Sequence, residues 1–551
     1  MHLPIRTPDA SDSVRYAKSF ILLPVLISVV LCHTEAESCS SETICSKTRK
    51  REAVTKHPNI AFTVTERGLL TFMPTIPFYL KALLMHCKFK DKYGVLFGRN
   101  YADILKRNIT AVGNDTVILS TLMEPNLVNL DIQKLSVTED AFIRLYNGRS
   151  GKSSMELQEV RGNVIISLTA NQHGMLVTKV AGCDLSIGKV KITYTSTNGK
   201  VTILNPTRIE RRVKDSLNGY ICDDVNTVVS LLDARFRNMF KEQPMAQTTA
   251  SELTSQLFIS RILRSIHFAN ADNAAPKIKR LIYVQRLFEA PKFASSPQSA
   301  SFLLTGMICD RQHCGIGSSP VSVPNIVKAK DKMINLYVSD DVAQTFLQSM
   351  FDLGLLNMSF TGKNFVKRRS SFHQPCLRST CLDILPSWFT TNSNEKTELK
   401  VYHTKVPSLQ YKSGKAVLSN EMKVLLYSRS LNSHVRKILL TAINATFHLR
   451  IAPTTGRVFK VNAQTAKMEV SVLENYLMIT DEELKQLVGT IKQAVHASFQ
   501  VLLDMSFELR ASCATMENLH AEFHQGSVFL AFDLILNDQC LIKKLTAVVQ
   551  Q

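Results

Sequence analysis

The 551-residue sequence lacks the signatures by which most enzymes are recognised. It contains no Gly-x-Ser-x-Gly nucleophile elbow, no His-Glu-x-x-His motif, no Walker loop and no glycine-rich dinucleotide turn. Its 14 histidines are scattered and have no paired carboxylates beside them. The sequence therefore predicts a protein that is not an enzyme and that needs no cofactor.

Long apolar runs are also missing. The longest, FILLPVLISVVLC at residues 20–32, is interrupted by Pro24 and follows Arg15 and Lys18. This run is too short to span a bilayer but is typical of a secretory signal peptide. We expect residues 1–36 to be a signal peptide, residues 37–56 an N-terminal extension and the mature protein to be soluble and extracellular; the alternative is a type II signal anchor.

Cysteine is too scarce for a small disulfide-dense fold, since the whole chain has 12. Cys309 and Cys314, like Cys376 and Cys381, are spaced as pairs that could close short loops. The same spacings occur in zinc sites, but no further His or Cys pair lies nearby to complete four ligands. We therefore expect no metal site.

Four glycosylation sequons fit an exported chain: Asn108, Asn114, Asn357 and Asn444. Asn444 lies in INATFHLRI, where Ile443, Ala445 and Phe447 alternate with it. This period of two predicts a strand with Asn444 on its solvent face.

Basic residues are in excess, and the formal net charge is +20. They are dispersed along the chain rather than gathered in a tail. For a secreted protein, an anionic lipid, glycan or microbial surface is a more natural partner than nucleic acid. The alternative is that the excess charge only keeps a monomeric protein soluble.

Most of the remaining sequence predicts β-strands, as in VIISLTA (164–170), KVKITYTST (189–197) and SVFLAFDLIL (527–536). Helical spacing occurs in four segments, of which the first contains Pro77 and so predicts a short or kinked helix. The four segments are residues 75–87, 206–240, 340–354 and 481–503. Ser339 is expected to cap the third, and Thr480 with Glu483 forms a capping box for the fourth.

These elements predict an α+β chain with two copies of one strand–helix–meander–long-helix module. We divide it into an N-terminal lobe at 57–288, a linker or central sheet at 289–329 and a C-terminal lobe at 330–551. The apolar stripe of each long helix would face an antiparallel sheet, and what lies between them is either a packed core or a cavity for an apolar ligand.

Cys222 lies within the 206–240 helix, and Cys183 lies in VAGCDLSIGKVKITY on a strand that precedes it. A Cys183–Cys222 bridge would pin the helix to the sheet. On the chain-entropy model, closing such a loop of about 40 residues contributes roughly 4 kcal/mol. The alternative is a pair of buried free thiols.

This arrangement resembles the family of bactericidal permeability-increasing protein, lipopolysaccharide-binding protein and the related lipid transfer proteins. HPNIAFTVTERGLL (57–70) is similar to the family's opening strand, KDKMINLYVSDDVAQTFLQSMFDLGLLNMSF (330–360) to the start of its second lobe, and HAEFHQGSVFLAFDLIL (520–536) to its last strand pair. The motifs occur in the family's order, and the resemblance extends over about residues 57–540 of the chain.

The resemblance implies an elongated molecule with two tubular lipid-binding lobes joined by a central sheet. Each lobe would be a twisted antiparallel barrel with a long helix and an acyl-chain pocket. The N-terminal pocket would be lined by Leu217, Ile221, Val225, Val228 and Leu232. The C-terminal pocket would be lined by Leu484, Val488, Ile491, Val495 and Phe499.

The resemblance also implies that basic residues at the N-terminal tip bind anionic headgroups. The matching residues are Arg144, Arg149, Lys152 and Lys200, with Lys88, Lys90 and Lys92 as a further cluster. Three functions therefore compete: a secreted carrier of phospholipid-like ligands, an innate-immune binder of lipopolysaccharide or other envelope lipid, and a secreted structural or interaction protein with vestigial pockets.

Overall fold

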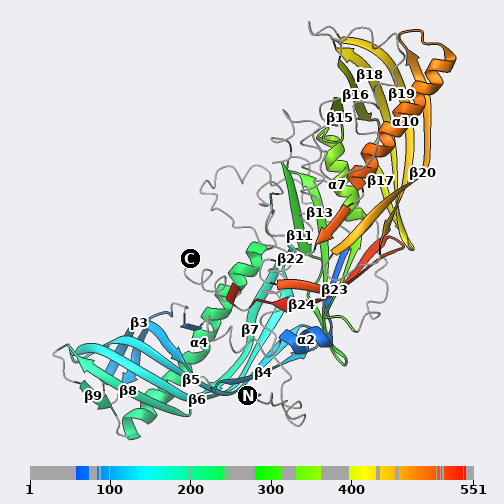
Figure 1. Cartoon of the computed structure of the whole chain (residues 1–551). Helices are drawn as coiled ribbons and strands as arrows, with labels where there is room; N and C mark the ends of the chain where they lie inside the picture. Colours follow the sequence, from blue (N-terminus) through cyan, green and yellow to red (C-terminus); the bar gives the residue numbers. More distant parts are fainter. Residues whose placement is uncertain are drawn as a thin grey trace, which may run out of the picture.

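The computed structural model describes residues 57–72, 84–85, 89–97, 100–113, 115–197, 201–204, 207–239, 243–244, 277, 280–311, 331–361, 396–429, 435–452, 458–503, 505–508, 510–511, 514–537 and 539–540. These residues form an elongated α+β molecule in which two outer sheets lie at either side of a central sheet (Figure 1). All strand pairs among them are antiparallel. The predicted fold class is confirmed.

The N-terminal sheet has the order β2-β3-β5-β6-β8-β9, with β4 added to β5 and β7 added to β6. Its strands are β2 (Lys92–Phe97), β3 (Asn100–Val112), β4 (Val117–Met123), β5 (Leu127–Leu145), β6 (Ser150–Ala170), β7 (Leu176–Ser186), β8 (Lys189–Ser196) and β9 (Val201–Leu204). Buried and exposed residues alternate along β5, so one face of the sheet is apolar. Helix α4 (Thr207–Met239) lies along this sheet (Figure 1) and confirms the helix expected at 206–240.

The C-terminal sheet has the order β15-β16-β18-β19-β20-β21, with β17 added to β18. Its strands are β15 (Met358–Thr361), β16 (Lys396–His403), β17 (Ser408–Lys412), β18 (Lys415–Arg429), β19 (Val435–Ile451), β20 (Val458–Asn475) and β21 (Met505–Glu508). Helix α10 (Asp481–Leu503) runs along it (Figure 1) and confirms the helix expected at 481–503.

The central sheet combines strands from both halves of the chain, in the order β10-β11-β13-β1-β14-β24-β23-β22 with β12 added to β13. Its strands are β1 (Ile60–Val64), β10 (Gln243–Pro244), β11 (Leu281–Leu287), β12 (Lys292–Ser295), β13 (Gln298–Asp310), β14 (Ile334–Ser339), β22 (Arg510–Ala511), β23 (Ala514–His524) and β24 (Ser527–Leu536). The expectation that this sheet belongs to residues 289–329 is too narrow, because β1 lies between β13 and β14.

A strand, a short helix, a meander and a long helix follow one another in each half, as the sequence predicts. In the C-terminal half the short helix is α7 (Asp340–Asp352), and the Ser339 side chain caps it by accepting a hydrogen bond from the Asp341 backbone N–H. At the start of α10, the Thr480 backbone N–H and hydroxyl both donate to the Glu483 carboxylate.

The short helix of the N-terminal half was not predicted from the sequence. It is α2 (Glu66–Phe72), whereas of the expected residues 75–87 only 84–85 are described, and both are helical. Thr65 starts α2, since its carbonyl accepts from the Leu69 N–H and its hydroxyl from the Gly68 N–H. Gly68 has no space for a side chain, because a Cβ there would lie 2.5 Å from the Met333 carbonyl oxygen.

Candidate lipid-binding site

The apolar stripe of α4 faces the N-terminal sheet. Leu217, Val228 and Leu232 are buried in the same apolar cluster as the sheet's inner side chains, and Ile221 and Val225 pack against it partly buried. All five residues expected to line the N-terminal pocket therefore lie on the buried side of the helix. The sequence predicted this face because its apolar positions recur every three or four residues.

One flank of α4 is attached to β7 by a covalent bond and by hydrogen bonds. Cys183 on β7 and Cys222 on α4 form a disulfide with a Cα–Cα distance of 5.9 Å, so the predicted bridge is present. Further along the helix, the Asp233 carboxylate accepts a hydrogen bond from the Thr178 backbone N–H at 2.6 Å. About one turn before Cys222, the Asn218 side-chain oxygen accepts a hydrogen bond at 2.9 Å from the N–H of Ile187, which directly follows β7.

The opposite flank of α4 is attached by charged groups. Arg107 on β3 is buried and forms two-pronged hydrogen bonds with Glu139 on β5, at 2.6 and 2.9 Å. It forms a second pair with Asp224 on α4, at 3.0 and 2.8 Å. Lys92 Nζ on β2 lies 3.3 Å from Asp224 Oδ1 and sits over the Tyr220 ring.

This charged cluster is held in its ionised form. Burial disfavours the Arg107 guanidinium, but its hydrogen bonds to Glu139 and Asp224 outweigh this and raise the pKa of Arg107 above its already high value. The cluster was not predicted from the sequence. The strand geometry is irregular beside Arg107: Lys106 has φ of 53°, and the pairing of β3 with β5 shifts there.

The apolar stripe of α10 makes the matching contact in the C-terminal half. Ile491 and Val495 are buried in the core of this sheet, and Leu484 and Val488 pack against that core partly buried. Leu487, which was not among the expected pocket residues, is buried there too. The side chain of Phe499 lies outside the described residues.

The basic residues predicted at the N-terminal tip are brought together in part. Arg144 at the end of β5 and Lys152 at the start of β6 are exposed, and the pairing of Phe142 with Lys152 places them on the same outer face. Arg149, in the turn between these strands, is also exposed. Arg144 donates to Asp103 on β3 at 2.7 Å, and this hydrogen bond lowers the pKa of the Asp103 carboxyl.

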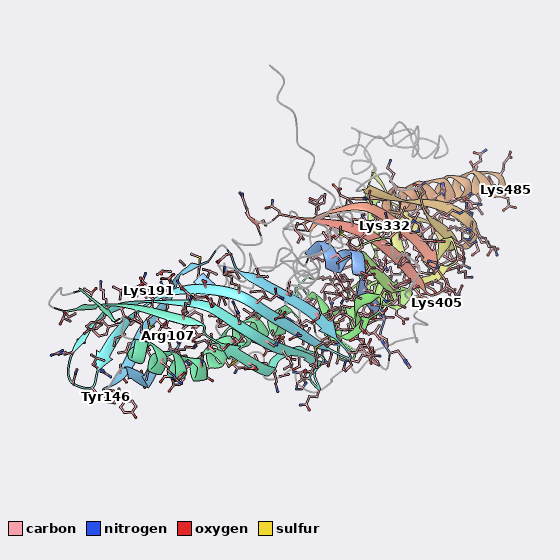
Figure 2. All side chains as sticks on the ribbon, turned by 90° about the horizontal axis from the view of Figure 1, so that it is seen from below. Arg107, Tyr146, Lys191, Lys332, Lys405 and Lys485 are labelled. Atoms are coloured by element: carbon pink, nitrogen blue, oxygen red, sulfur yellow. A yellow bond between two sulfur atoms is a disulfide. The ribbon has the colours of Figure 1, made fainter. Side chains whose placement is uncertain are left out.

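Exposed tyrosines surround these basic residues and were not predicted. Tyr93, Tyr101 and Tyr146 have 61%, 53% and 63% of their surface exposed. The rings of Tyr101 and Tyr146 are 6.2 Å apart, and Figure 2 shows Tyr146 at one extreme of the molecule. Aromatic rings with a polar end suit the boundary between lipid and water.

The expectation that Lys92 binds headgroups is wrong. Its side chain is 9% exposed and is directed to Asp223 and Asp224 on α4, so it belongs to the charged attachment of the helix. Lys90 is exposed. Lys88 and Lys200 lie outside the described residues, as do residues 1–56.

The sequons differ in their surroundings. Asn444 is exposed on β19 between the buried Ile443 and Ala445, which confirms its predicted place on the solvent face. Asn108 is exposed on β3. Asn357 is half-buried and its side-chain oxygen accepts from the His403 backbone N–H at 3.3 Å, so this sequon is engaged within the fold. Asn114 lies outside the described residues.

Residues 294–534 match the family described as "LBP / BPI / CETP family, C-terminal domain". This match supports membership of the chain in the LBP / BPI / CETP family. Its members bind lipids, are not enzymes and are secreted. No curated protein matches the sequence. Among the described residues, no helix is both long and apolar enough to span a membrane.

Several solved structures are similar to this chain. The crystal structure of lipopolysaccharide binding protein is 13% identical, with a TM-score of 0.40, and the match covers 87% of this chain and 99% of that one. The structure of P47 from Clostridium botulinum A2 is 9% identical, with a TM-score of 0.27 and coverage of 86% and 97%. P47 of Clostridium botulinum E1 is 8% identical, with a TM-score of 0.23 and coverage of 86% and 98%. At these TM-scores the likenesses say nothing about function.

Proposed function

We propose that this protein is a secreted carrier that holds phospholipid-like ligands between each long helix and its sheet. The observation that carries the proposal is the apolar stripe of α4, which lies on the inner side of the N-terminal sheet while its polar attachments stay on the flanks. A ligand chain entering between helix and sheet would meet Ile221 and Val225, which are the less buried members of the stripe. Family membership supports lipid as the ligand.

Native mass spectrometry of the full-length protein, purified from secreting cells, tests this proposal. We expect co-purifying phospholipid, and we expect Val228→Asp to abolish it, because an unpaired carboxylate in an apolar site costs several kcal/mol. Asn226→Asp, which adds the same charge at an exposed position of α4, is the matched control and should keep its lipid.

Two outcomes would count against the proposal. An empty wild-type protein would favour a structural or interaction role with vestigial pockets. Unchanged lipid content in a Val228→Asp variant whose circular dichroism is native would show that this face of α4 is packed core and not a ligand site.

Binding of anionic envelope lipid is a second candidate function. It is favoured by the exposed Arg149 and Lys152 beside the three tyrosines at the N-terminal tip. Arginine and lysine both suit phosphate groups. Unlike the carrier function, this one depends on the outer surface of the tip and not on the face of α4, so the two can be tested separately.

A further inference from the structure

The turn between β20 and α10 contains a solvent-exposed methionine, Met478. Met478 is 90% exposed and has φ of 52°, a left-handed conformation that residues with a Cβ rarely adopt. The turn is closed by Asn475, whose side-chain amide donates to the Ile479 carbonyl at 2.9 Å and whose side-chain oxygen accepts from the Ile479 N–H at 3.1 Å. The outward position of Met478 is therefore built into the backbone.

The residues on either side of Met478 anchor the turn. Ile479 is buried in the C-terminal core and Leu477 packs against it. The hydrogen bonds between Thr480 and Glu483 then fix the start of α10. Backbone strain that the surrounding structure maintains is characteristic of functional sites, and here it presents an apolar side chain to the outside.

Other exposed apolar side chains surround this turn. Leu473 lies near the end of β20 and Tyr476 directly follows this strand; both are exposed, and Lys437 Nζ lies 5.4 Å from the centre of the Tyr476 ring. The Tyr476 N–H donates to the Ile438 carbonyl, so the start of β19, with Val435 54% exposed, lies alongside. We call Val435, Leu473, Tyr476 and Met478 the C-terminal apolar tip.

The tip lies at an extreme of the molecule, and charged side chains of both signs surround it. Figure 2 shows Lys485, in the first turns of α10, at the opposite end from Tyr146. Three basic and three acidic side chains are exposed near the turn: Arg436, Lys437, Lys485, Glu474, Asp481 and Glu482. This contrasts with the N-terminal tip, where exposed basic residues gather.

We propose that the C-terminal apolar tip inserts into a zwitterionic lipid surface. A projecting methionine next to a tyrosine, surrounded by charges of both signs, fits a phosphatidylcholine headgroup layer better than an anionic one. Insertion is driven by burial of apolar area and not by charge, so it persists at high salt. The proposal adds a docking surface to the carrier function and rests on that function only for its physiological purpose.

A single-tryptophan reporter tests the insertion. The one tryptophan of the sequence, Trp388, is replaced by Phe, and Met478→Trp is introduced into the full-length chain. With phosphatidylcholine vesicles in about 1 M NaCl, where the Debye length is about 3 Å, we expect a blue shift of the emission and quenching by brominated lipid. Ile535→Trp, at an exposed position on β24 in the central sheet, is the control and should not respond.

Met478→Gly separates insertion from folding. Glycine adopts positive φ without strain, so this variant should be at least as thermally stable as the parent. Its affinity for phosphatidylcholine vesicles should nevertheless fall about tenfold, because an apolar side chain no longer leaves water. Ile535→Ser should bind like the parent.

An unshifted emission from the Met478→Trp variant, or full vesicle affinity in Met478→Gly, would overturn the proposal. Lipid content measured by native mass spectrometry is an independent readout. A variant that keeps its co-purified lipid but fails to bind vesicles locates the defect at the tip, whereas an empty protein that still inserts refutes only the carrier function.

Discussion

Histidine 403 shows how a single residue of this protein responds to pH. It lies at the end of β16 and is 9% exposed. Burial lowers its pKa from 6.5 to about 4, although a hydrogen bond with the Leu356 backbone opposes this effect. The folded protein therefore keeps His403 neutral at pH values where the unfolded chain binds a proton.

The stability contributed by the neutral His403 should be lost on acidification. It is fully present above pH 6.5 and declines as pH falls towards about 4, because only the unfolded state is protonated in this range. At about 1.4 kcal/mol per pH unit, the loss amounts to roughly 3 kcal/mol. Urea unfolding from pH 7 to 4 measures it, and His403→Gln should flatten the curve. Parallel curves for parent and variant would assign the pH dependence to other groups. One such group is His448, because burial lowers its pKa too.

The elements that local sequence determines were the best predicted. The bounds of α10 and the position of its capping box agree with the structure, since apolar periodicity and end signals are properties of a few neighbouring residues. Helix α2 was missed because it has only 7 residues, too few for a periodic pattern.

Interactions between distant residues were predicted only where the chemistry restricts the choice. Cys183 and Cys222 could be paired from sequence because few cysteines lie near α4. Arg107, in contrast, binds Asp224 across 117 positions of sequence, and nothing local distinguishes these two residues from the chain's many other charges. The apolar faces of α4 and α10 could be predicted from the sequence. Whether packed side chains or a cavity lies between each helix and its sheet could not, because this depends on the full three-dimensional packing.

Helix α4 is attached along both flanks, by Cys183–Cys222 on one side and by the Arg107 cluster on the other. Removing the disulfide with Cys183→Ser and Cys222→Ser should cost roughly 4 kcal/mol. Asp224→Asn should cost about 2 kcal/mol, because the buried Arg107 loses a charged partner. The free energy of unfolding from denaturant titration measures both changes.

The two attachments should be coupled if they hold the same helix against the sheet. In a double-mutant cycle, the combined variant should deviate from additivity by more than about 0.5 kcal/mol. Asp223→Asn is the matched control, because the neighbouring Asp223 is 63% exposed in its side chain and should contribute less than about 1 kcal/mol. Strict additivity would mean that each flank is held independently.

At the scale of the whole molecule, the two ends differ in chemistry. The central sheet joins the halves through β1, which pairs with β13 on one side and β14 on the other. One end carries Arg144, Arg149 and Lys152 with exposed tyrosines, and the other carries the neutral C-terminal apolar tip. Two ends of different character suit a carrier that meets two kinds of lipid surface.

The basic end should bind anionic vesicles in a salt-dependent way. Replacing Arg144, Arg149, Lys152 and Lys200 together by Ser should lower the affinity for phosphatidylserine-containing vesicles, at about 1 kcal/mol for each residue near the surface. Arg144 should contribute least, because Asp103 already neutralises it. Affinity of the parent should fall as salt rises and the Debye length shortens to about 8 Å at physiological strength.

Vesicle co-sedimentation with an equal-charge control decides whether the position of these charges matters. The control replaces four exposed lysines in or beside the C-terminal sheet by Ser: Lys405, Lys412, Lys423 and Lys460. If the tip is a specific site, only the tip variant loses affinity, and both variants keep the lipid that co-purifies with them. If both lose affinity equally, the net charge of +20 attracts the surface as a whole. Envelope recognition would then have no specific site on this protein, and the carrier function would remain the only one supported.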